Sequence, residues 1–237
     1  MENLQNNFKA APWYEESSKH TISVLGAGGI GSNTIYNLAK TLLSTIVIID
    51  FDAVEEHNIG SQFFKLRDRG SPKVRALEAA LGEYLGSYRR CIGLVGNINQ
   101  YIPKQYCTPI TISAFDNMDA RKKSFEDWKS LDDRLLYIDG RLRATQYEVF
   151  CVVPGLEEKY EGTLFTSGDV PPDPCTFKQT SYAGMMIGAR ITSFVTNFLY
   201  NYTLKEEICS VPFHYKELLE LCHTEVEEMP KLNSDAE

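Results

Sequence analysis

The sequence predicts an α/β fold: a Rossmann-like, mostly parallel sheet with helices on both faces and an antiparallel C-terminal extension. Three observations lead to this prediction. A short apolar strand runs into the glycine-rich stretch VLGAGGIGSN at 24–33, and a helix-like pattern follows it. Apolar strands then alternate with helical patterns up to residue 140, which is typical of a parallel sheet covered by helices. After residue 140, polar and apolar residues alternate, which favours an antiparallel strand.

The elements before residue 140 each have a local signal. The strand TIVIID at 45–50 is apolar and β-branched, as expected for a central strand covered on both faces. The helix expected at 71–85 has Ser71 as its N-cap, Pro72 in its first turn and a single apolar stripe. The other expected strands are 21–26, 91–96, 109–115 and 135–140, and the other expected helices are 32–43 and 117–131.

The remainder of the chain divides into four segments. We expect an antiparallel strand at 146–154, a long irregular stretch at 155–179 and a long, largely apolar helix at 182–204. The acidic C-terminal end is expected to fray. The predicted organisation is a polar N-terminal lead-in at 1–20, one domain at 21–225 and an acidic flexible tail at 226–237.

Composition narrows the classes of function. The 237 residues carry a formal net charge of -8, which argues against non-specific binding of nucleic acid. No run of about 18 apolar residues and no apolar signal core occur, so we expect no membrane span and a cytoplasmic protein. Six cysteines lie far apart without a Cys-x-x-Cys pair, so no structural zinc site is expected.

The glycine loop predicts a nucleotide site. Glycines let the backbone approach a phosphate closely, and the following helix supplies free N–H groups. Asp50 ends the next strand, where a carboxylate accepts hydrogen bonds from a ribose. These two features fit NAD and ATP equally well. Lys73 at a helix start and Asp116 at a strand end favour ATP, because a lysine neutralises phosphate charge and an aspartate can hold Mg²⁺.

Taken together, these motifs resemble the ThiF/MoeB/ubiquitin-activating-enzyme superfamily of adenylating proteins, in its minimal single-domain, bacterial or phage type. The resemblance covers about residues 20–204. It rests on a GxGGxGS loop, a D-x-D element, an N-x-x-R-Q element, a lysine and a D-N-x-x-x-R element. In this chain they are Gly26, Gly28, Gly29, Gly31 and Ser32; Asp50 and Asp52; Asn58 and Gln62; Lys73; and Asp116, Asn117 and Arg121.

The resemblance implies an ATP-dependent adenylyltransferase that uses Mg²⁺. Such proteins convert a carboxylate to an acyl-adenylate and release pyrophosphate. The carboxylate is often the C-terminal glycine of a ubiquitin-like or sulfur-carrier-like protein, although a small carboxylate is an alternative substrate. Lys73 and a Mg²⁺ held by Asp116 would neutralise charge, and Cys175 would be a thioester or persulfide cysteine. The remaining motif residues would bind ATP, Arg141 and Arg143 would meet the carboxylate, and a homodimer is expected.

The chain departs from the family pattern in two places. The arginine of N-x-x-R-Q is Ser61, so Lys65, Arg67 or Arg69 would have to reach the phosphates instead. In addition, residues 1–20 contain no R-Y-x-R-Q segment, which in many members crosses to the partner subunit. These departures keep open a nucleotide-binding pseudoenzyme or scaffold subunit that needs a partner. A weaker alternative is an NAD-dependent oxidoreductase.

Several site residues also have a purely structural interpretation. Lys73 would be a solvated residue of a first helical turn, and Arg141 and Arg143 would pair with acidic residues. Asp50 would cap a turn, Asp52 would pair with a lysine, and Asp116 would cap the helix that follows it. Arg121 would form an internal ion pair, and Cys175 would be a half-buried structural cysteine.

Overall fold

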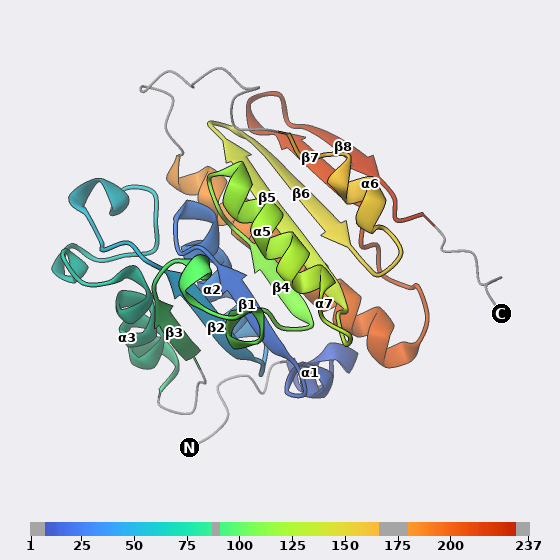
Figure 1. The fold of residues 1–237 in the computed structure, drawn as a ribbon, viewed down its shortest axis with the longest axis horizontal. Coiled ribbons are helices and arrows are strands. Elements are labelled where there is room, and N and C mark those ends of the chain that lie inside the picture. Colours follow the sequence, from blue (N-terminus) through green and yellow to red (C-terminus); the bar gives the residue numbers. More distant parts are fainter. Residues whose placement is uncertain (1–7, 87–90, 166–179, 231–237) are drawn as a thin grey trace.

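The computed structural model describes residues 8–86, 91–165 and 180–230, and within these ranges eight strands form one mixed sheet (Figure 1). The strand order is β3-β2-β1-β4-β5-β6-β7-β8. Pairing is parallel from β3 to β5 and antiparallel from β5 to β8. This confirms the predicted fold class. The strands are β1 (Thr21–Leu25), β2 (Thr45–Asp50), β3 (Cys91–Val95), β4 (Ile110–Ser113), β5 (Leu136–Arg143), β6 (Gln146–Val152), β7 (His214–Leu218) and β8 (His223–Glu227).

The strand order reverses beside β1. Val24 of β1 pairs with Ile48 of β2 on one side and with Ile112 of β4 on the other. The loops that leave β1 and β4 therefore diverge from neighbouring strand ends and open a crevice between them. In open α/β sheets, ligands bind at such a switch point, outside the carboxyl ends of the strands.

Helices cover both faces of the sheet and enclose two hydrophobic cores. α2 (Gly29–Thr41), α3 (Lys73–Leu85) and α7 (Ser181–Leu204) contribute to one core. The short α4 (Pro103–Tyr106), α5 (Met118–Lys129) and α6 (Glu157–Glu161) contribute to the other, which is rich in aromatic rings. α1 (Pro12–Ser17) packs against α7 (Figure 1). Single 3-10 turns lie at Glu56–Asn58, Leu66–Asp68, Ile98–Gln100 and Leu219–Leu221.

The long apolar helix α7 is packed closely onto α2. A Cβ on Gly184 would lie 2.9 Å from the carbonyl oxygen of Gly29, and one on Gly188 would lie 2.9 Å from the amide nitrogen of Thr34. Glycines four residues apart thus let the two helix backbones touch. Packing within the chain accounts for the buried face of α7, as expected of a core helix, whereas Tyr182, Met185 and Met186 remain exposed.

Several boundaries differ from the sequence-based expectations. α3 begins at Lys73, and Ser71 does not cap it; the carbonyl of Asp52 instead accepts the N–H of Lys73 at 2.9 Å. α2 begins at Gly29, three residues before the expected start. The stretch expected to be irregular contains α6, and β8 takes in two residues of the expected tail.

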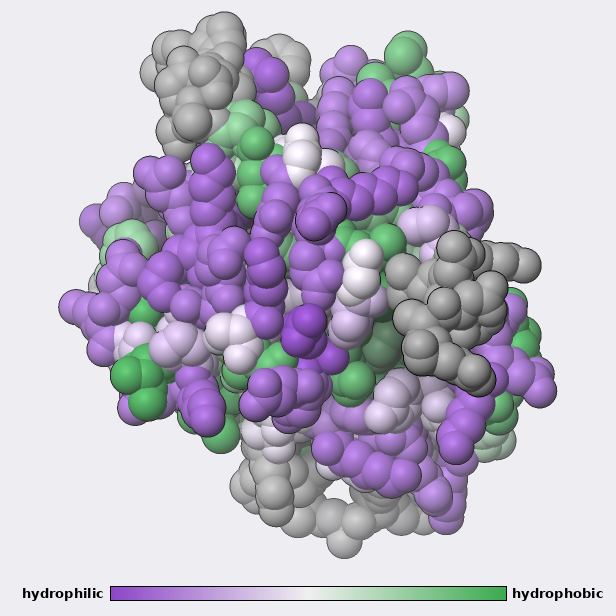
Figure 2. Space-filling view, turned by 45° about the vertical axis from the view of Figure 1, so that its right-hand side comes forward, coloured by the Kyte–Doolittle hydropathy of each residue, from purple (hydrophilic) through white to green (hydrophobic). Residues whose placement is uncertain are grey.

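Two further observations concern the hydropathy of the surface and of the helices. The face seen in Figure 2 is mostly hydrophilic, and its hydrophobic residues lie in small, separate groups. Among the helices that the structure describes, none has the length and hydropathy needed to cross a membrane.

Candidate functional site

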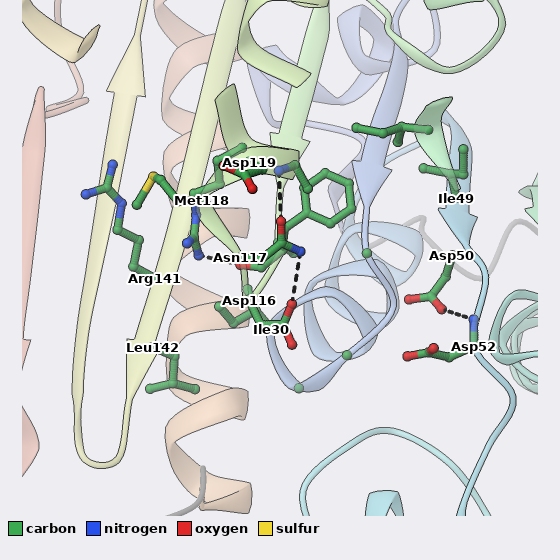
Figure 3. A pocket seen from close by; sticks show the side chains of 18 of the residues that line it. Ile30, Ile49, Asp50, Asp52, Asp116, Asn117, Met118, Asp119, Arg141 and Leu142 are labelled. Carbon is green, nitrogen blue, oxygen red and sulfur yellow. Dashed lines mark hydrogen bonds between the residues drawn. The ribbon is translucent and has the colours of Figure 1, made fainter. Parts of the chain in front are cut away.

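A cavity of about 1050 Å³ lies at the switch point. Its walls are the glycine loop after β1, the end of β2, the loop after β4 and the hairpin between β5 and β6. In Figure 3, Asp50 and Asp52 lie on one side of the cavity, Arg141 and Leu142 lie on the other, and Asp116 and Asn117 lie between them. The predicted site residues that line the cavity are Gly26, Gly28, Gly29, Asp50, Asp52, Gln62, Lys73, Asp116, Asn117, Arg121, Arg141 and Arg143.

The glycines of the loop have different tasks. Gly26 has a φ of +98°, which favours glycine, and a Cβ there would lie 2.9 Å from the carbonyl oxygen of Ala114. A Cβ on Gly31 would lie only 1.8 Å from the carbonyl oxygen of Gly26. Gly31 therefore closes the loop onto α2 and does not line the cavity. Gly28 does line it and faces open space, so a ligand can approach its backbone.

Asp50 ties the glycine loop to the segment after β2. Its Oδ2 accepts the N–H of Ala27 at 2.7 Å. Its Oδ1 accepts the N–H of Asp52 at 2.7 Å (Figure 3). Burial raises the pKa of this carboxyl above its ordinary value, and the two backbone hydrogen bonds oppose that rise. The turn-capping role is thus present. Each oxygen retains a second lone pair for a ligand hydroxyl.

Lys73 and Asp52 form an ion pair at the edge of the cavity, with 2.7 Å between Nζ and Oδ2. The Lys73 side chain is 7% exposed, whereas that of Asp52 is 47% exposed. A buried ammonium at the N-terminus of a helix is unfavourable because it opposes the helix dipole. Asp52 offsets that cost, so the pair places a positive charge beside the cavity at the start of α3.

The cap of α5 is Asn117, which corrects the interpretation of Asp116 as the capping residue. The Asn117 side chain accepts the N–H of Ala120 at 2.8 Å. Asp116 remains exposed in the cavity, and within the described part of the chain its side chain accepts only a long hydrogen bond, from Asn117 Nδ2 at 3.4 Å. The described residues contain no group of three or more His, Cys, Asp or Glu arranged for a metal ion. Asp116 nevertheless fits Mg²⁺, which commonly uses one or two carboxylates together with substrate phosphates.

Of the two residues of this chain that match the N-x-x-R-Q element, Gln62 lines the cavity and Asn58 does not. Asn58 is buried, and its Oδ1 accepts the N–H of Glu55 at 2.9 Å, so it shapes the turn and does not line the cavity. Gln62 lines the cavity, and its buried Oε1 has no hydrogen-bond partner among the described residues. Because this oxygen is itself buried, it would meet a ligand donor only if the Gln62 side chain turned toward the cavity.

None of the basic residues expected to replace the arginine at position 61 lines the cavity. Lys65 and Arg67 both pair with Glu83, and Arg69 pairs with Glu56 at 3.1 Å. In the free protein these side chains lie outside the cavity, so contact of one of them with the phosphates stays a prediction.

Sequence reasoning missed Asp139, a fully buried acid in the middle of β5, beside Ser113 at the end of β4. It accepts hydrogen bonds from Arg121 Nε at 2.8 Å and from Arg141 Nε at 2.7 Å. The ion-pair interpretation of Arg121 is therefore present. Burial opposes the charge on Asp139, but the two guanidinium groups outweigh it and hold the pKa of this carboxyl below its ordinary value.

The lowered pKa of Asp139 predicts a pH-dependent stability. At pH 7, Asp139→Asn should lower the free energy of unfolding by about 3 kcal/mol, because a buried guanidinium loses its partner. The folded carboxyl keeps its charge at pH values where the unfolded chain has already bound a proton. The wild-type advantage is therefore complete above the ordinary value of 3.8 and shrinks below it. Urea unfolding of both proteins between pH 7 and pH 3 checks this, and a constant difference would contradict it.

No cysteine of the described residues lines this cavity. Cys175 lies outside the described residues. Burial raises the pKa of the Cys91 and Cys107 thiols to about 12 and also raises that of Cys151, so these three are poor nucleophiles at neutral pH.

The family match decides the classification. Residues 3–217 match the ThiF family. The chain belongs to the ThiF family. Among its curated relatives is ubiquitin-like modifier-activating enzyme 5 of Bombyx mori, which is 30% identical over 120 residues. That alignment covers 46% of this chain and 30% of the relative. The catalytic subunit of the NEDD8-activating enzyme E1 of Dictyostelium discoideum is 34% identical over 80 residues, which cover 33% of this chain and 15% of the relative.

Solved structures of low sequence identity share the fold of this ThiF-family chain. E. coli MccB crystallised with succinimide gives a TM-score of 0.71 at 18% identity, over 94% of this chain and 68% of MccB. MccB crystallised with ATP gives 0.69 at 18% identity, over 94% and 68% of the two chains. PaaA gives 0.70 at 17% identity, over 93% and 67%. The ThiF-family chain thus spans about two thirds of these structural neighbours and less than a third of the curated relatives.

Proposed function

We propose that this chain is an ATP-dependent adenylyltransferase that activates a carboxylate. A carboxylate oxygen attacks the α-phosphorus of ATP, the bond from that phosphorus to the bridging oxygen of the β-phosphate breaks, and pyrophosphate leaves. The product is an acyl-adenylate. The observation that carries this proposal is the convergence of Gly28, Lys73 and Asp116 on one cavity at the switch point of the sheet. MccB was crystallised with ATP, and curated relatives activate ubiquitin-like modifiers by name, which supports the same chemistry here.

We assign the nucleotide to the side of the cavity formed by the glycine loop and Asp50. The Asp50 carboxylate would accept hydrogen bonds from the ribose hydroxyls, and the backbone around Gly28 and Gly29 would meet phosphates at the start of α2. Lys73 would exchange part of its contact with the exposed Asp52 for a phosphate oxygen. Charge neutralisation at the α-phosphate lowers the barrier, because negative charge builds up there in the transition state.

Binding should depend on Mg²⁺. The cavity lining has equal numbers of acidic and basic side chains, so its formal charge is zero. A triphosphate adds several negative charges that the lining alone does not balance. Mg²⁺ at Asp116 would supply positive charge to the phosphates, and Asn117 would keep the start of α5 in place beside it.

Gln62 gives opposite predictions for stability and binding. Gln62→Met should raise the free energy of unfolding by about 1 kcal/mol, because it removes a buried acceptor that has no partner in the free protein. The same change should weaken Mg-ATP binding about tenfold, because the ligand loses the polar side chain that lines this wall of the cavity. Urea unfolding and isothermal titration measure the two effects. A variant that loses stability and keeps its affinity would show that Gln62 serves only the fold.

The activity test is ATP–pyrophosphate exchange. Exchange should require an added protein or peptide with a free C-terminal glycine carboxylate, and the same molecule with an amidated C-terminus should give none. Exchange with a small carboxylate alone would change the substrate class and leave the reaction in place. No exchange with any carboxylate, although Mg-ATP binds, would contradict the proposed enzyme.

The second candidate is a nucleotide-binding subunit that needs a partner for catalysis. It is favoured by Ser61 and by the carboxylate pairing of Lys65, Arg67 and Arg69. This candidate predicts that Mg-ATP binds normally while exchange stays absent until a partner subunit is added. Exchange by the purified chain alone contradicts it.

We also propose a homodimer that works in the cytoplasm. Tyr182, Met185 and Met186 expose large apolar side chains near the start of α7, which supports burial against a second subunit. Sedimentation equilibrium tests this proposal, and a single monomeric species at every concentration would contradict it.

Cys175 remains a proposed acceptor of the acyl group or of sulfur. The test is to trap a thioester on the wild-type protein and to show that Cys175→Ser forms none.

A further inference from the structure

One buried carboxylate behind the cavity holds two of the basic side chains that line it. Asp139 is fully buried, and its two oxygens accept from the Nε atoms of Arg121 and Arg141 at 2.8 and 2.7 Å. The hydroxyl of Tyr160 on α6 donates to the same carboxylate at 3.0 Å. The arginines come from α5 and β5, so Asp139 links its own strand to the preceding helix and, through Tyr160, to α6.

Arg121 is fixed by more than the ion pair. It also donates to the carbonyl oxygen of Phe115 and to that of Gly140, the latter at 3.1 Å. Phe115 directly precedes Asp116 in the loop after β4. The guanidinium therefore ties that loop to β5, and the position of Asp116 in the cavity depends on an arginine that Asp139 holds.

Arg141 is fixed on the side of the cavity opposite Asp50 (Figure 3). It donates to the carbonyl and hydroxyl oxygens of Thr163 at 3.2 and 3.1 Å, and its guanidinium lies 4.3 Å from the centre of the Phe150 ring. A free arginine loses much rotational freedom when it binds a ligand. An arginine that is already held loses little, so its contact with an anion is stronger.

We propose that Asp139 is a positioning residue of the adenylation site. It fixes Arg121 and Arg141 before substrate binds, and through them it sets the loop that carries Asp116. One carboxylate between two guanidinium groups leaves this cluster with a net positive charge, so it still attracts an anion although the lining as a whole is neutral. The ligand class is the phosphates of Mg-ATP and the carboxylate that attacks them. This role rests on the proposed function. Position 61 has a serine where the family pattern has an arginine, and the positioning role explains how the site still holds two arginines, Arg121 and Arg141, in place.

The first test uses the free protein. Nitrogen-15 NMR follows the Nε–Hε groups of Arg121 and Arg141, whose exchange with water should be slow in the wild-type protein because both donate to a buried carboxylate. Asp139→Asn should make at least one of the two exchange fast. Glu157→Gln is the matched control: Glu157 pairs with Arg134 at 3.0 Å outside the cavity lining, so both signals should persist. Fast exchange in the wild-type protein would overturn the proposal.

The second test is the Kd for Mg-ATP, measured by isothermal titration at a temperature where circular dichroism shows each variant folded. Asp139→Asn should raise the Kd about tenfold, as loss of an orienting residue does in other ligand sites. Tyr160→Phe, which removes one of three hydrogen bonds and keeps both ion pairs, should raise it about threefold, and Glu157→Gln should leave it unchanged. Tyr160→Phe decides the test if Asp139→Asn does not fold.

The outcomes separate this proposal from the proposed function. A wild-type protein that binds Mg-ATP while the folded variants of Asp139 and Tyr160 bind it equally well overturns the positioning role and leaves the adenylation proposal in place. A wild-type protein with slow exchange at both arginines that binds no Mg-ATP contradicts the adenylation proposal and, with it, the positioning role. A lower stability with an unchanged Kd assigns Asp139 to the fold alone.

Discussion

Lys73→Ala is expected to raise the Kd for Mg-ATP about a hundredfold, because a charge-assisted hydrogen bond to a phosphate in a partly buried site contributes about 1.5–3 kcal/mol. Lys73 is nearly buried, and Asp52 holds its ammonium at 2.7 Å beside the cavity. The same variant should lower ATP–pyrophosphate exchange by about 10²–10³, because charge builds up on the phosphates in the transition state. Isothermal titration and exchange assays measure the two effects.

The matched control for Lys73 is Lys129→Ala. Lys129 also pairs with a carboxylate, that of Glu161 at 2.6 Å, but it lies outside the cavity lining. Its removal should leave the Kd and the exchange rate unchanged. Equal losses in the two variants would mean that the effect comes from general charge. Normal binding in folded Lys73→Ala would remove this residue from the nucleotide site.

Gly31→Ala is expected to lower the free energy of unfolding by about 4 kcal/mol or to prevent folding. Its new Cβ would lie 1.8 Å from the carbonyl oxygen of Gly26, so the first turn of α2 and the loop after β1 would have to separate. Overpacking by one methyl group usually costs about 1–3 kcal/mol, and a contact with rigid backbone belongs above that range. Urea unfolding at pH 7 measures the loss.

Gly28→Ala is the contrasting change in the same loop. A Cβ on Gly28 meets no atom within 4 Å, so the fold should keep nearly all of its stability. The methyl group would occupy the space that a phosphate needs, so Mg-ATP binding should weaken. If Gly31→Ala were as stable as Gly28→Ala, the close contact between α2 and the loop would not be needed for folding. If Gly28→Ala bound Mg-ATP normally, the phosphates would lie elsewhere.

The parallel part of the fold was predictable because its signals are local. The β1 strand, the glycine loop and α2 are contiguous, and the apolar runs of β2 and β4 allow one interpretation each. The β7–β8 hairpin was not predicted, because its strands HYKEL and HTEVE are short and polar. β7 depends on pairing with β6 for its conformation, and β8 depends on pairing with β7. α6 was hidden within a proline-rich stretch and is only five residues long.

The residues that line the cavity were predictable where the residue type at a position suits only one role. Gly26, Asp50 and Lys73 line the cavity as expected. Asp116 and Asn117 are neighbours that both suit a helix cap, so the sequence alone did not determine which one caps α5. Asp139 lies in an apolar strand, and no function was predicted for it from the sequence. Its spacing of two residues from Arg141 nevertheless places both side chains on one face of β5. Its ion pair with Arg121 needs the tertiary fold.

The central claim is that the switch-point cavity binds Mg-ATP, and thermal unfolding with different nucleotides tests it most directly. Mg-ATP at a hundred times its Kd should add about 2.7 kcal/mol to the free energy of unfolding. We expect this shift to fall with ATP plus a chelator, to be absent with NAD, and to fall to about 0.4 kcal/mol in Lys73→Ala at the same ligand concentration. A shift with NAD and none with Mg-ATP would contradict the claim and favour an oxidoreductase.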